Sequence, residues 1–188
     1  MKKNLVIIDG NEKDLKLRDE IIDSLNSYFN MDSKMNLLYL DEMNLRSCLG
    51  CFNCWVRTPG RCIINDKNEL KNELFVKSDY IIFVSRINYG MYSSTFKVAL
   101  DRLIPNLAPF FKMIDGEMHH KRRYKKDFKI FTIGYGTDIL SDEKITFEDI
   151  VKRNMINLHS TESKLLIIEN NNFKRELFSK LDLFCGGK

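Results

Sequence analysis

The sequence contains no apolar run that approaches the ~20 residues a helix needs to cross a lipid bilayer. Its first residues carry two lysines and then only the short apolar run 5–8. The longer apolar region and the small-residue cleavage site of a signal peptide are both missing. We therefore expect a cytoplasmic protein without a membrane partner. Thiols stay reduced in that compartment, so structural disulfides are not expected and metal or redox chemistry is favoured.

The chain also lacks internal repeats, low-complexity linkers and a large excess of one charge. A formal net charge of +4 is too small to indicate a nucleic-acid partner, and no nucleic-acid-binding motif accompanies it. Hydrophobic residues make up 44% of the sequence and charged residues 30%, which is typical of a globular protein. The length of 188 residues predicts a single domain, spanning 1–188.

Short apolar runs alternate with segments of helical periodicity along the whole chain. Continuously apolar strands separated by helices indicate a parallel sheet that is covered on both faces. The expected fold is α/β, a flavodoxin-like three-layer sandwich with a five-stranded parallel sheet in the order 2-1-3-4-5. We predict strands at 4–9, 35–40, 79–85, 128–136 and 163–169, helices at 12–29, 66–77, 93–104, 141–158 and 172–184, and inserted loops at about 41–65 and 107–127.

Two of the predicted helices begin with capping signals. Asp66 and Glu69 have the spacing of a capping box, and Ser93 or Ser94 can cap the helix that Pro105 limits. In a sheet of this kind the ligand lies beyond the carboxyl ends of the strands, where the strand order reverses. The segments at these ends are 9–14, 48–62, 85–94 and 134–138, so the cysteine-rich segment 48–62 is expected on the ligand side.

Four of the five cysteines lie within residues 48–62, with the spacing C-x2-C-x2-C-x7-C. Three closely spaced cysteines are the compact half of many iron–sulfur sites, and a turn at 58–60 could bring the fourth back to them. Zinc is less favoured, because structural zinc sites usually join two separated pairs of ligands. The thiols could also be a redox pair at Cys51 and Cys54, or small packing residues. The candidate metal ligands are Cys48, Cys51, Cys54 and Cys62.

Several stretches, namely 48–70, 78–105, 109–111 and 116–124, together resemble the NAD(P)H-dependent FMN reductase and iron–sulfur flavoprotein branch of the flavodoxin superfamily. The cysteine spacing and an S-x-x-x-Y-G-x-x-S element at 85–93 are fairly specific in combination. The resemblance covers roughly residues 3–136, which is most of the chain. It implies FMN as cofactor and NAD(P)H as substrate, with a [4Fe-4S] cluster as a further candidate.

The resemblance also implies where a flavin would bind. The segment 85–90 would lie along the isoalloxazine edge, with Tyr89 or Tyr92 stacked on the ring and Arg86 near a negative reduced flavin or a substrate carboxylate. The alternative is that Arg86 is a solvated rim residue and Ser93 only caps a helix. The expected cofactor-binding residues are Gly10, Asn11, Ser85, Arg86, Asn88, Tyr89, Gly90, Tyr92, Ser93, Gly134, Tyr135 and Gly136.

The first loop departs from the family pattern, which usually reads G-S-P-R. Residues 9–14 read DGNEKD, with three carboxylates, one lysine and no hydroxyl. Repulsion between unit charges is ~1 kcal/mol at 4 Å in water. A helix N-terminus attracts an anion by only ~0.3–1 kcal/mol. This loop therefore weighs against tight binding of the FMN phosphate, and the alternative is an ordinary helix start capped by Asn11 or Asp14.

A basic segment at 117–126 reads EMHHKRRYKK. The simplest interpretation is a solvent-exposed insertion without a specific function, since most runs of charged residues are solvated. The alternatives are a clamp for the 2′-phosphate of NADPH, or an anion site in an oligomer at which Arg122 and Arg123 contact a neighbouring subunit's cofactor. The apolar residues of 109–113 need a cover, either the protein's own core or a second subunit, so a homo-oligomer is expected.

Three functions follow, with no side chain assigned as a catalytic acid or base. The first is an FMN-dependent NAD(P)H oxidoreductase, similar to flavin reductases, or a flavin electron-transfer protein. It would act on a small-molecule or flavin substrate or on an electron-transfer partner. The second is an iron–sulfur flavoprotein that relays single electrons. The third is a non-catalytic flavodoxin-fold protein that has lost FMN and binds a partner or another ligand.

Overall fold

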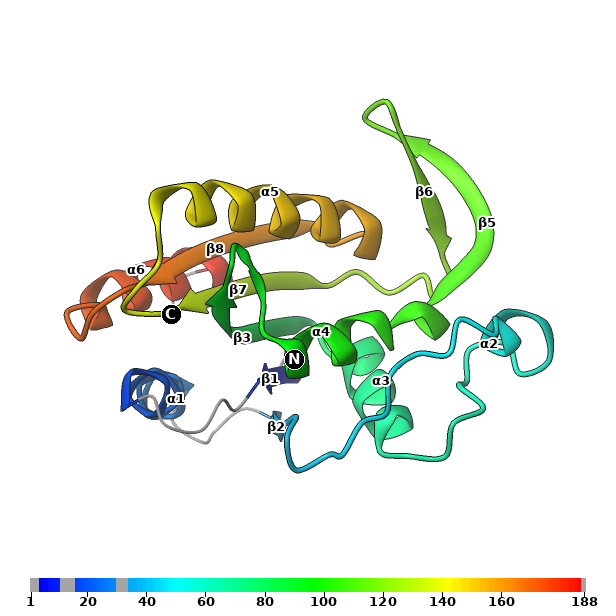
Figure 1. Cartoon of the computed structure of the whole chain (residues 1–188), viewed down its shortest axis with the longest axis horizontal. Coiled ribbons are helices and arrows are strands. Elements are labelled where there is room, and N and C mark those ends of the chain that lie inside the picture. Colours follow the sequence, from blue (N-terminus) through cyan, green and yellow to red (C-terminus); the bar gives the residue numbers. More distant parts are fainter. Residues whose placement is uncertain (1–3, 11–15, 30–33, 187–188) are drawn as a thin grey trace.

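The computed structural model describes residues 4–10, 16–29 and 34–186. A central sheet is covered by helices on both faces (Figure 1). The strands are β1 (Asn4–Asp9), β2 (Lys34–Tyr39), β3 (Tyr80–Asn88), β4 (Met91–Tyr92), β5 (Leu107–Ile114), β6 (Glu117–Arg122), β7 (Lys129–Tyr135) and β8 (Glu162–Ile168). The helices are α1 (Lys16–Phe29), α2 (Asn53–Val56), α3 (Asn68–Lys77), α4 (Ser94–Asp101), α5 (Ser141–Leu158) and α6 (Lys174–Cys185), with a 3-10 turn at Ile104–Asn106.

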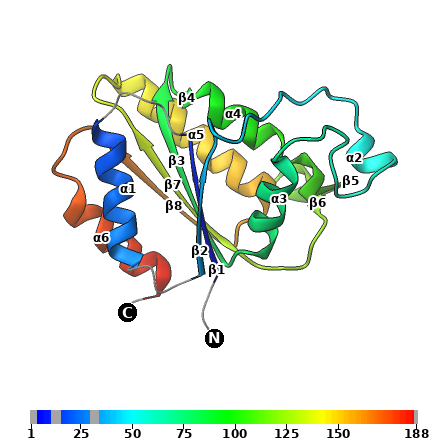
Figure 2. The ribbon, with the colours of Figure 1, turned by 90° about the horizontal axis from the view of Figure 1, so that it is seen from below.

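The five parallel strands run in the order β2-β1-β3-β7-β8. This is the order 2-1-3-4-5 of the flavodoxin-like fold, so the predicted fold class is confirmed. Apolar residues alternate between the two faces of the strands: Leu5 and Ile7 pack with α1 and α6, and Val6 and Ile8 pack with α3, α4 and α5. Figure 2 shows these two layers on opposite sides of the sheet.

Two predicted helix starts have different outcomes. Ser93 caps α4 as expected, since its Oγ accepts a hydrogen bond from the backbone N–H of Phe96 at 3.3 Å. The capping box predicted at Asp66 and Glu69 does not form in that way. Asp66 accepts from the backbone N–H of Asn68, but the carboxylate of Glu69 pairs with Arg61 instead of turning back to the helix start.

The segment predicted as an inserted loop at 107–127 is largely a two-stranded antiparallel hairpin, β5–β6, which projects from the body of the domain (Figure 1). Asp115 and Gly116 form its turn with φ values of 49° and 83°. Positive φ at both central residues is characteristic of a type I′ turn, for which Asp-Gly is a preferred pair. The segment 41–65 contains the short helix α2 but no strand.

No helix in the described part of the chain is both long and apolar enough to span a membrane.

Candidate functional site

The carboxyl ends of β1 and β3 meet at the edge of the sheet where the sequence predicts a flavin. The backbone N–H of Gly10 donates to the carbonyl of Val84 at 2.9 Å. A Cβ at Gly10 would lie only 3.2 Å from the Oγ of Ser93. Glycine therefore lets the end of β1 pack directly against the segment that follows β3. Asn11, the neighbouring predicted ligand, and the rest of the acidic loop at 11–14 lie outside the described residues.

Two buried serines hold the segment 85–93 in shape. The Oγ of Ser85 accepts a hydrogen bond from the backbone N–H of Ser93 at 3.0 Å, and the Oγ of Ser93 caps α4. Both side chains are 0% exposed. Their hydroxyls therefore fix the backbone, which supports the capping role considered for Ser93.

Tyr89 and Gly90 form a tight turn between β3 and β4, with φ values of 51° and 72°. Tyr89 is 92% exposed, so both faces of its ring are open. A Cβ at Gly90 would lie 2.9 Å from the Cβ of Thr146, so only glycine fits against α5 there. The turn is thus a rigid support that presents one aromatic ring to the solvent.

Tyr92, the other predicted stacking residue, lies in the core. Its ring centroid is 5.0 Å from that of Phe96 and 5.1 Å from that of Phe147, and the residue is 3% exposed. Burial raises the pKa of its hydroxyl to about 12. In this structure its ring has no open face for a flavin, which leaves Tyr89 as the exposed aromatic residue of the segment.

The predicted residues at the end of β7, together with Gly136 directly after it, contribute packing at the same edge. A Cβ at Gly134 would lie 2.6 Å from a ring carbon of Phe147. Tyr135 is 0% exposed, and Gly136 donates its backbone N–H to the carbonyl of Ile168. The partly exposed groups of the rim are instead Asn88 and Arg86, whose guanidinium lies 3.6 Å from the carboxylate of Asp138.

The first carboxylate of the acidic loop has a cation that the sequence analysis missed. The Nε of Arg18 donates to Oδ2 of Asp9 at 2.8 Å, and Asp9 is 0% exposed. Burial alone would lower the pKa of Arg18, but the hydrogen bonds and charges of Asp9 and Asp19 raise it. The guanidinium also lies 5.2 Å from the ring centroid of Tyr39. One of the three negative charges counted against a phosphate is therefore neutralised inside the protein.

The four clustered cysteines line one hollow, which we call the thiol hollow. Cys48 and Cys51 are exposed, Cys62 is half-buried and Cys54 is buried, and all four are free thiols. The remaining wall residues are Leu49, Gly50, Phe52, Ile63, Ile64, Arg102, Ile104 and Pro105.

The backbone around Cys51 adopts the left-handed conformation twice, at Gly50 with φ 63° and at Phe52 with φ 54°. Such turns direct successive backbone N–H groups to one concave side, as in many anion and iron–sulfur sites. A backbone N–H of Asn53 lowers the pKa of Cys51. Burial, followed by the charges of the other three thiols, raises the pKa of Cys54. The four sulfurs are therefore close enough to interact.

These thiols do not converge on a single point. Among residues 4–10, 16–29 and 34–186, no group of three His, Cys, Asp or Glu side chains could hold one metal ion. A zinc ion needs each thiolate sulfur at about 2.3 Å, and no three cysteines of the described residues surround one such position. A [4Fe-4S] cluster would be held by four thiolates, and the four cysteines that line the thiol hollow match that ligand set.

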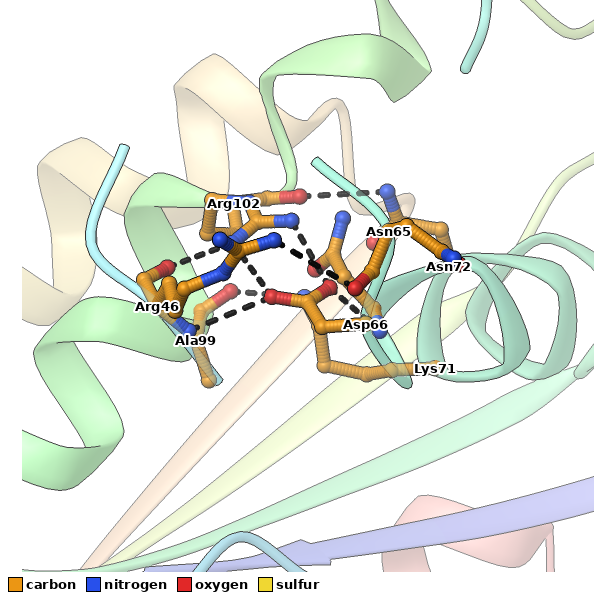
Figure 3. Close-up of polar contacts among 8 residues, drawn as sticks. Arg46, Asn65, Asp66, Lys71, Asn72, Ala99 and Arg102 are labelled. Carbon is orange, nitrogen blue, oxygen red and sulfur yellow. Dashed lines mark hydrogen bonds and ion pairs between the residues drawn. The ribbon is translucent and has the colours of Figure 1, made fainter. Parts of the chain in front are cut away.

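The thiol hollow is anchored to the rest of the domain by a buried ion pair (Figure 3). Arg102 at the end of α4 donates to both oxygens of Asp66, each at 2.9 Å, and to the carbonyl of Arg46. Burial would raise the pKa of Asp66, but hydrogen bonds from Arg102 and two backbone N–H groups lower it. The pair thereby joins both ends of the cysteine segment to α4.

Lys71 lies next to this pair in Figure 3, with 1% of its surface exposed. Its Nζ donates to the carbonyl of Ala99 at 2.6 Å. Burial and the charge of Arg102 lower its pKa well below the ordinary lysine value, with Asp66 opposing them. Burial therefore disfavours the charged form of this amine.

The basic segment uses most of its charges within the chain. Arg122 pairs with Asp127 at 2.8 Å, and Lys126 pairs with Asp79 at 3.2 Å. Arg123 donates to the backbone carbonyls of Pro105 and Leu107, which fastens the base of the hairpin. These contacts give the three basic side chains structural roles.

No family model matches the chain. A 72-residue stretch is 40% identical to the iron-sulfur flavoprotein CD630_04720 of Clostridioides difficile strain 630, and it covers 38% of this chain and 31% of that protein. The chain thus matches about a third of the length of this curated relative.

The fold is similar to that of solved reductases. One is an FMN-dependent NADH-azoreductase from Bacillus anthracis in complex with FMN, with 13% identity, a TM-score of 0.64, and 96% of this chain and 99% of that chain covered. Another is an NAD(P)H:quinone oxidoreductase from Methanothermobacter marburgensis, with 11% identity, a TM-score of 0.67, and 96% and 95% covered. At these identities the likeness shows the fold, which is flavodoxin-like.

Proposed function

We propose that the protein is a flavodoxin-fold oxidoreductase that binds FMN at the carboxyl edge of β1, β3 and β7 and accepts electrons from NAD(P)H. The observation that carries this proposal is the exposed ring of Tyr89 on a turn fixed by Gly90, at the edge where this fold binds ligands. Structural neighbours named as FMN-dependent or flavin-linked reductases support it.

The chain's own residues would bind and orient the flavin. Tyr89 would stack on the ring, and Arg86 would place positive charge beside it. Arg18 would remove the repulsion that Asp9 otherwise exerts on the phosphate. When bound, FMN supplies hydride and single-electron transfer, while the protein tunes its position and electronics. The substrate would be a small molecule or a second flavin, because the site is open to solvent at Tyr89.

A titration of flavin-free protein with FMN tests this proposal through the quenching of flavin fluorescence. We expect a dissociation constant in the micromolar range or tighter, followed by bleaching of the bound flavin when NADH or NADPH is added without oxygen. Absence of binding would favour the third alternative, a non-catalytic module that has lost FMN.

A second candidate is an iron–sulfur flavoprotein in which Cys48, Cys51, Cys54 and Cys62 hold a [4Fe-4S] cluster. The specific observation in its favour is that all four thiols line one hollow beside left-handed backbone at Gly50 and Phe52. The partial match to an iron-sulfur flavoprotein agrees with it. Iron and acid-labile sulfide, assayed in protein purified without oxygen, would decide between this candidate and free thiols.

The protein is also proposed to form a homo-oligomer through the hairpin. Four large apolar side chains of β5 and β6 are more than half exposed: Phe110, Phe111, Met113 and Met118. A projecting hairpin with such side chains is typical of a surface that another subunit covers. We also propose a cytoplasmic location, because exposed thiols such as those of Cys48 and Cys51 stay reduced in that compartment.

A further inference from the structure

The wall of the thiol hollow contains a buried cation. Arg102 lines the hollow together with the four cysteines, and its side chain is 1% exposed. The residue directly follows α4, a helix that packs on one face of the sheet, so α4 sets its position and the cysteine segment does not (Figure 3). A buried arginine in a wall otherwise built of apolar residues and thiols requires an explanation.

The ion pair with Asp66 uses only some of the hydrogen-bond donors of the guanidinium. Nη1 and Nη2 each donate to a separate carboxylate oxygen at 2.9 Å, and Nη1 also reaches the carbonyl of Arg46. Two parallel hydrogen bonds fix the plane of the guanidinium. The carboxylate therefore engages its terminal nitrogens and leaves the Nε–H for another acceptor.

That Nε–H is buried and has no hydrogen-bond partner within the part of the chain that the structure describes. A buried donor on a charged group is unfavourable unless it finds an acceptor. The side chains that line the hollow are apolar apart from Arg102 and the cysteines, so sulfur is the side-chain acceptor that the wall offers.

We propose that Arg102 donates its Nε–H to sulfur in the thiol hollow, either a ligating cysteine or a sulfide of the cluster, and thereby raises the reduction potential of that centre. The proposal rests on the iron–sulfur candidate described above. Hydrogen bonds to sulfur and nearby positive charge stabilise the reduced form, which carries more negative charge. Arg102 is thus a positioning and tuning residue, and it is not a ligand.

Variants of Asp66 and Arg102 should shift the reduction potential in opposite directions. Its carboxylate offsets the charge of Arg102, so Asp66→Asn should raise the potential while Arg102 keeps its Nε–H. Arg102→Lys keeps a positive charge near Asp66 but removes the Nε–H, so it should lower the potential. A merely structural role would move both variants in the same direction.

The experiment is a redox titration of anaerobically purified protein, followed by electron paramagnetic resonance, with iron and sulfide assayed on each sample. We expect equal iron content, a more negative potential for R102K and a more positive one for D66N. Arg61→Met is the matched control, because it removes a positive charge from the same segment at an exposed site paired with Glu69. Its potential should equal that of the wild type.

Other outcomes would overturn the proposal. If R102K has the wild-type potential, the Nε–H does not influence the centre. If the potentials of R102K and D66N shift in the same direction, Arg102 has only a structural role. A folded R102K without iron would lead to the same conclusion. If R102K unfolds, the reduction potential of the double variant R102M/D66N is measured instead. A double variant with the wild-type potential refutes the proposal. Wild-type protein without iron refutes the iron–sulfur candidate itself, whatever flavin it binds.

Discussion

The Nε of Arg18 lies 2.8 Å from Oδ2 of Asp9, so a helix that begins after the acidic loop neutralises the residue that opens that loop. Asp9 is fully buried, and the Arg18 side chain is 12% exposed. A phosphate at this edge would meet less negative charge than the sequence alone indicates. The electrostatic objection to FMN is correspondingly weaker.

Replacing Arg18 with Met should therefore have two effects. It leaves the buried Asp9 without this cation, which should lower the free energy of unfolding by about 3–5 kcal/mol in a urea titration. The dissociation constant for FMN should also rise, because the charge of Asp9 is no longer offset. Lys16→Met is the control, since it removes an exposed cation from the start of the same helix. Equal FMN affinity in R18M and the wild type would contradict the role of this pair.

Tyr89 should matter for flavin affinity but not for folding. Stacking of an aromatic base on an aromatic side chain contributes roughly 1–3 kcal/mol, so Tyr89→Asn should weaken FMN binding about tenfold or more. Asn tolerates the left-handed conformation of this position, so stability should change by less than about 0.5 kcal/mol. Tyr92→Phe, which keeps its ring in the core, should bind FMN like the wild type. If Y92F loses more affinity than Y89N, the assignment of the stacking residue is wrong.

Buried Lys71 should make stability depend on pH. Above the ordinary lysine pKa, both the folded and the unfolded chain carry a neutral amine. As the pH falls below about 10.4, the unfolded chain binds a proton that the folded chain refuses, because burial lowers the folded pKa. Stability should therefore fall with decreasing pH until the folded pKa is reached.

Lys71→Met should flatten this dependence and raise stability at neutral pH by about 1–2 kcal/mol, since an apolar side chain of similar length replaces a buried amine. Urea unfolding between neutral pH and pH 10 measures both effects. Lys67→Met, an exposed substitution beside the start of the same helix, should leave the slope unchanged. A K71M variant with the wild-type slope would show that Lys71 is charged in the folded protein.

The cysteines of the thiol hollow should differ from the fifth cysteine. Cys62→Ser should abolish or strongly reduce iron and sulfide uptake during anaerobic reconstitution, because one ligand of the hollow is lost. Cys185→Ser, at the end of α6 and outside the hollow, should keep the wild-type iron content. Equal iron in both variants would show that the hollow is not the site of the metal.

The hairpin should determine the oligomeric state. Phe110→Ser combined with Met118→Ser should convert an oligomer into a monomer in light-scattering measurements, because it makes two of the exposed apolar residues polar. The fold should persist, since neither side chain is in the core. A wild type that is already monomeric at micromolar concentration would contradict the proposal.

The sheet could be predicted from the sequence because each parallel strand is a short apolar run bounded by polar residues. Runs such as 4–9 and 79–85 are buried on both faces, which leaves little ambiguity about their type. The hairpin β5–β6 was missed because its exposed apolar and basic residues show no alternation. The Asp115-Gly116 pair was the available signal, and it marks the turn.

The site was predicted less completely because its contacts join residues far apart in the sequence. Arg102 and Asp66 are separated by 36 positions, and no local pattern links them. Tyr89 and Tyr92 look equivalent in the sequence, but the turn at Gly90 reverses the chain and sends Tyr92 inward. The clustering of the four cysteines, by contrast, was evident from their spacing alone.

Whether the protein binds FMN is tested most directly by the visible absorption spectrum of protein purified without oxygen, with iron and acid-labile sulfide assayed on the same sample. We expect the two absorption bands of a bound flavin. If the cysteines hold a cluster, broad absorbance and about four irons per chain should accompany them. A colourless protein that remains colourless after FMN is added would contradict the proposed FMN binding, since the edge at Asp9, Tyr89 and Gly90 would then bind no flavin.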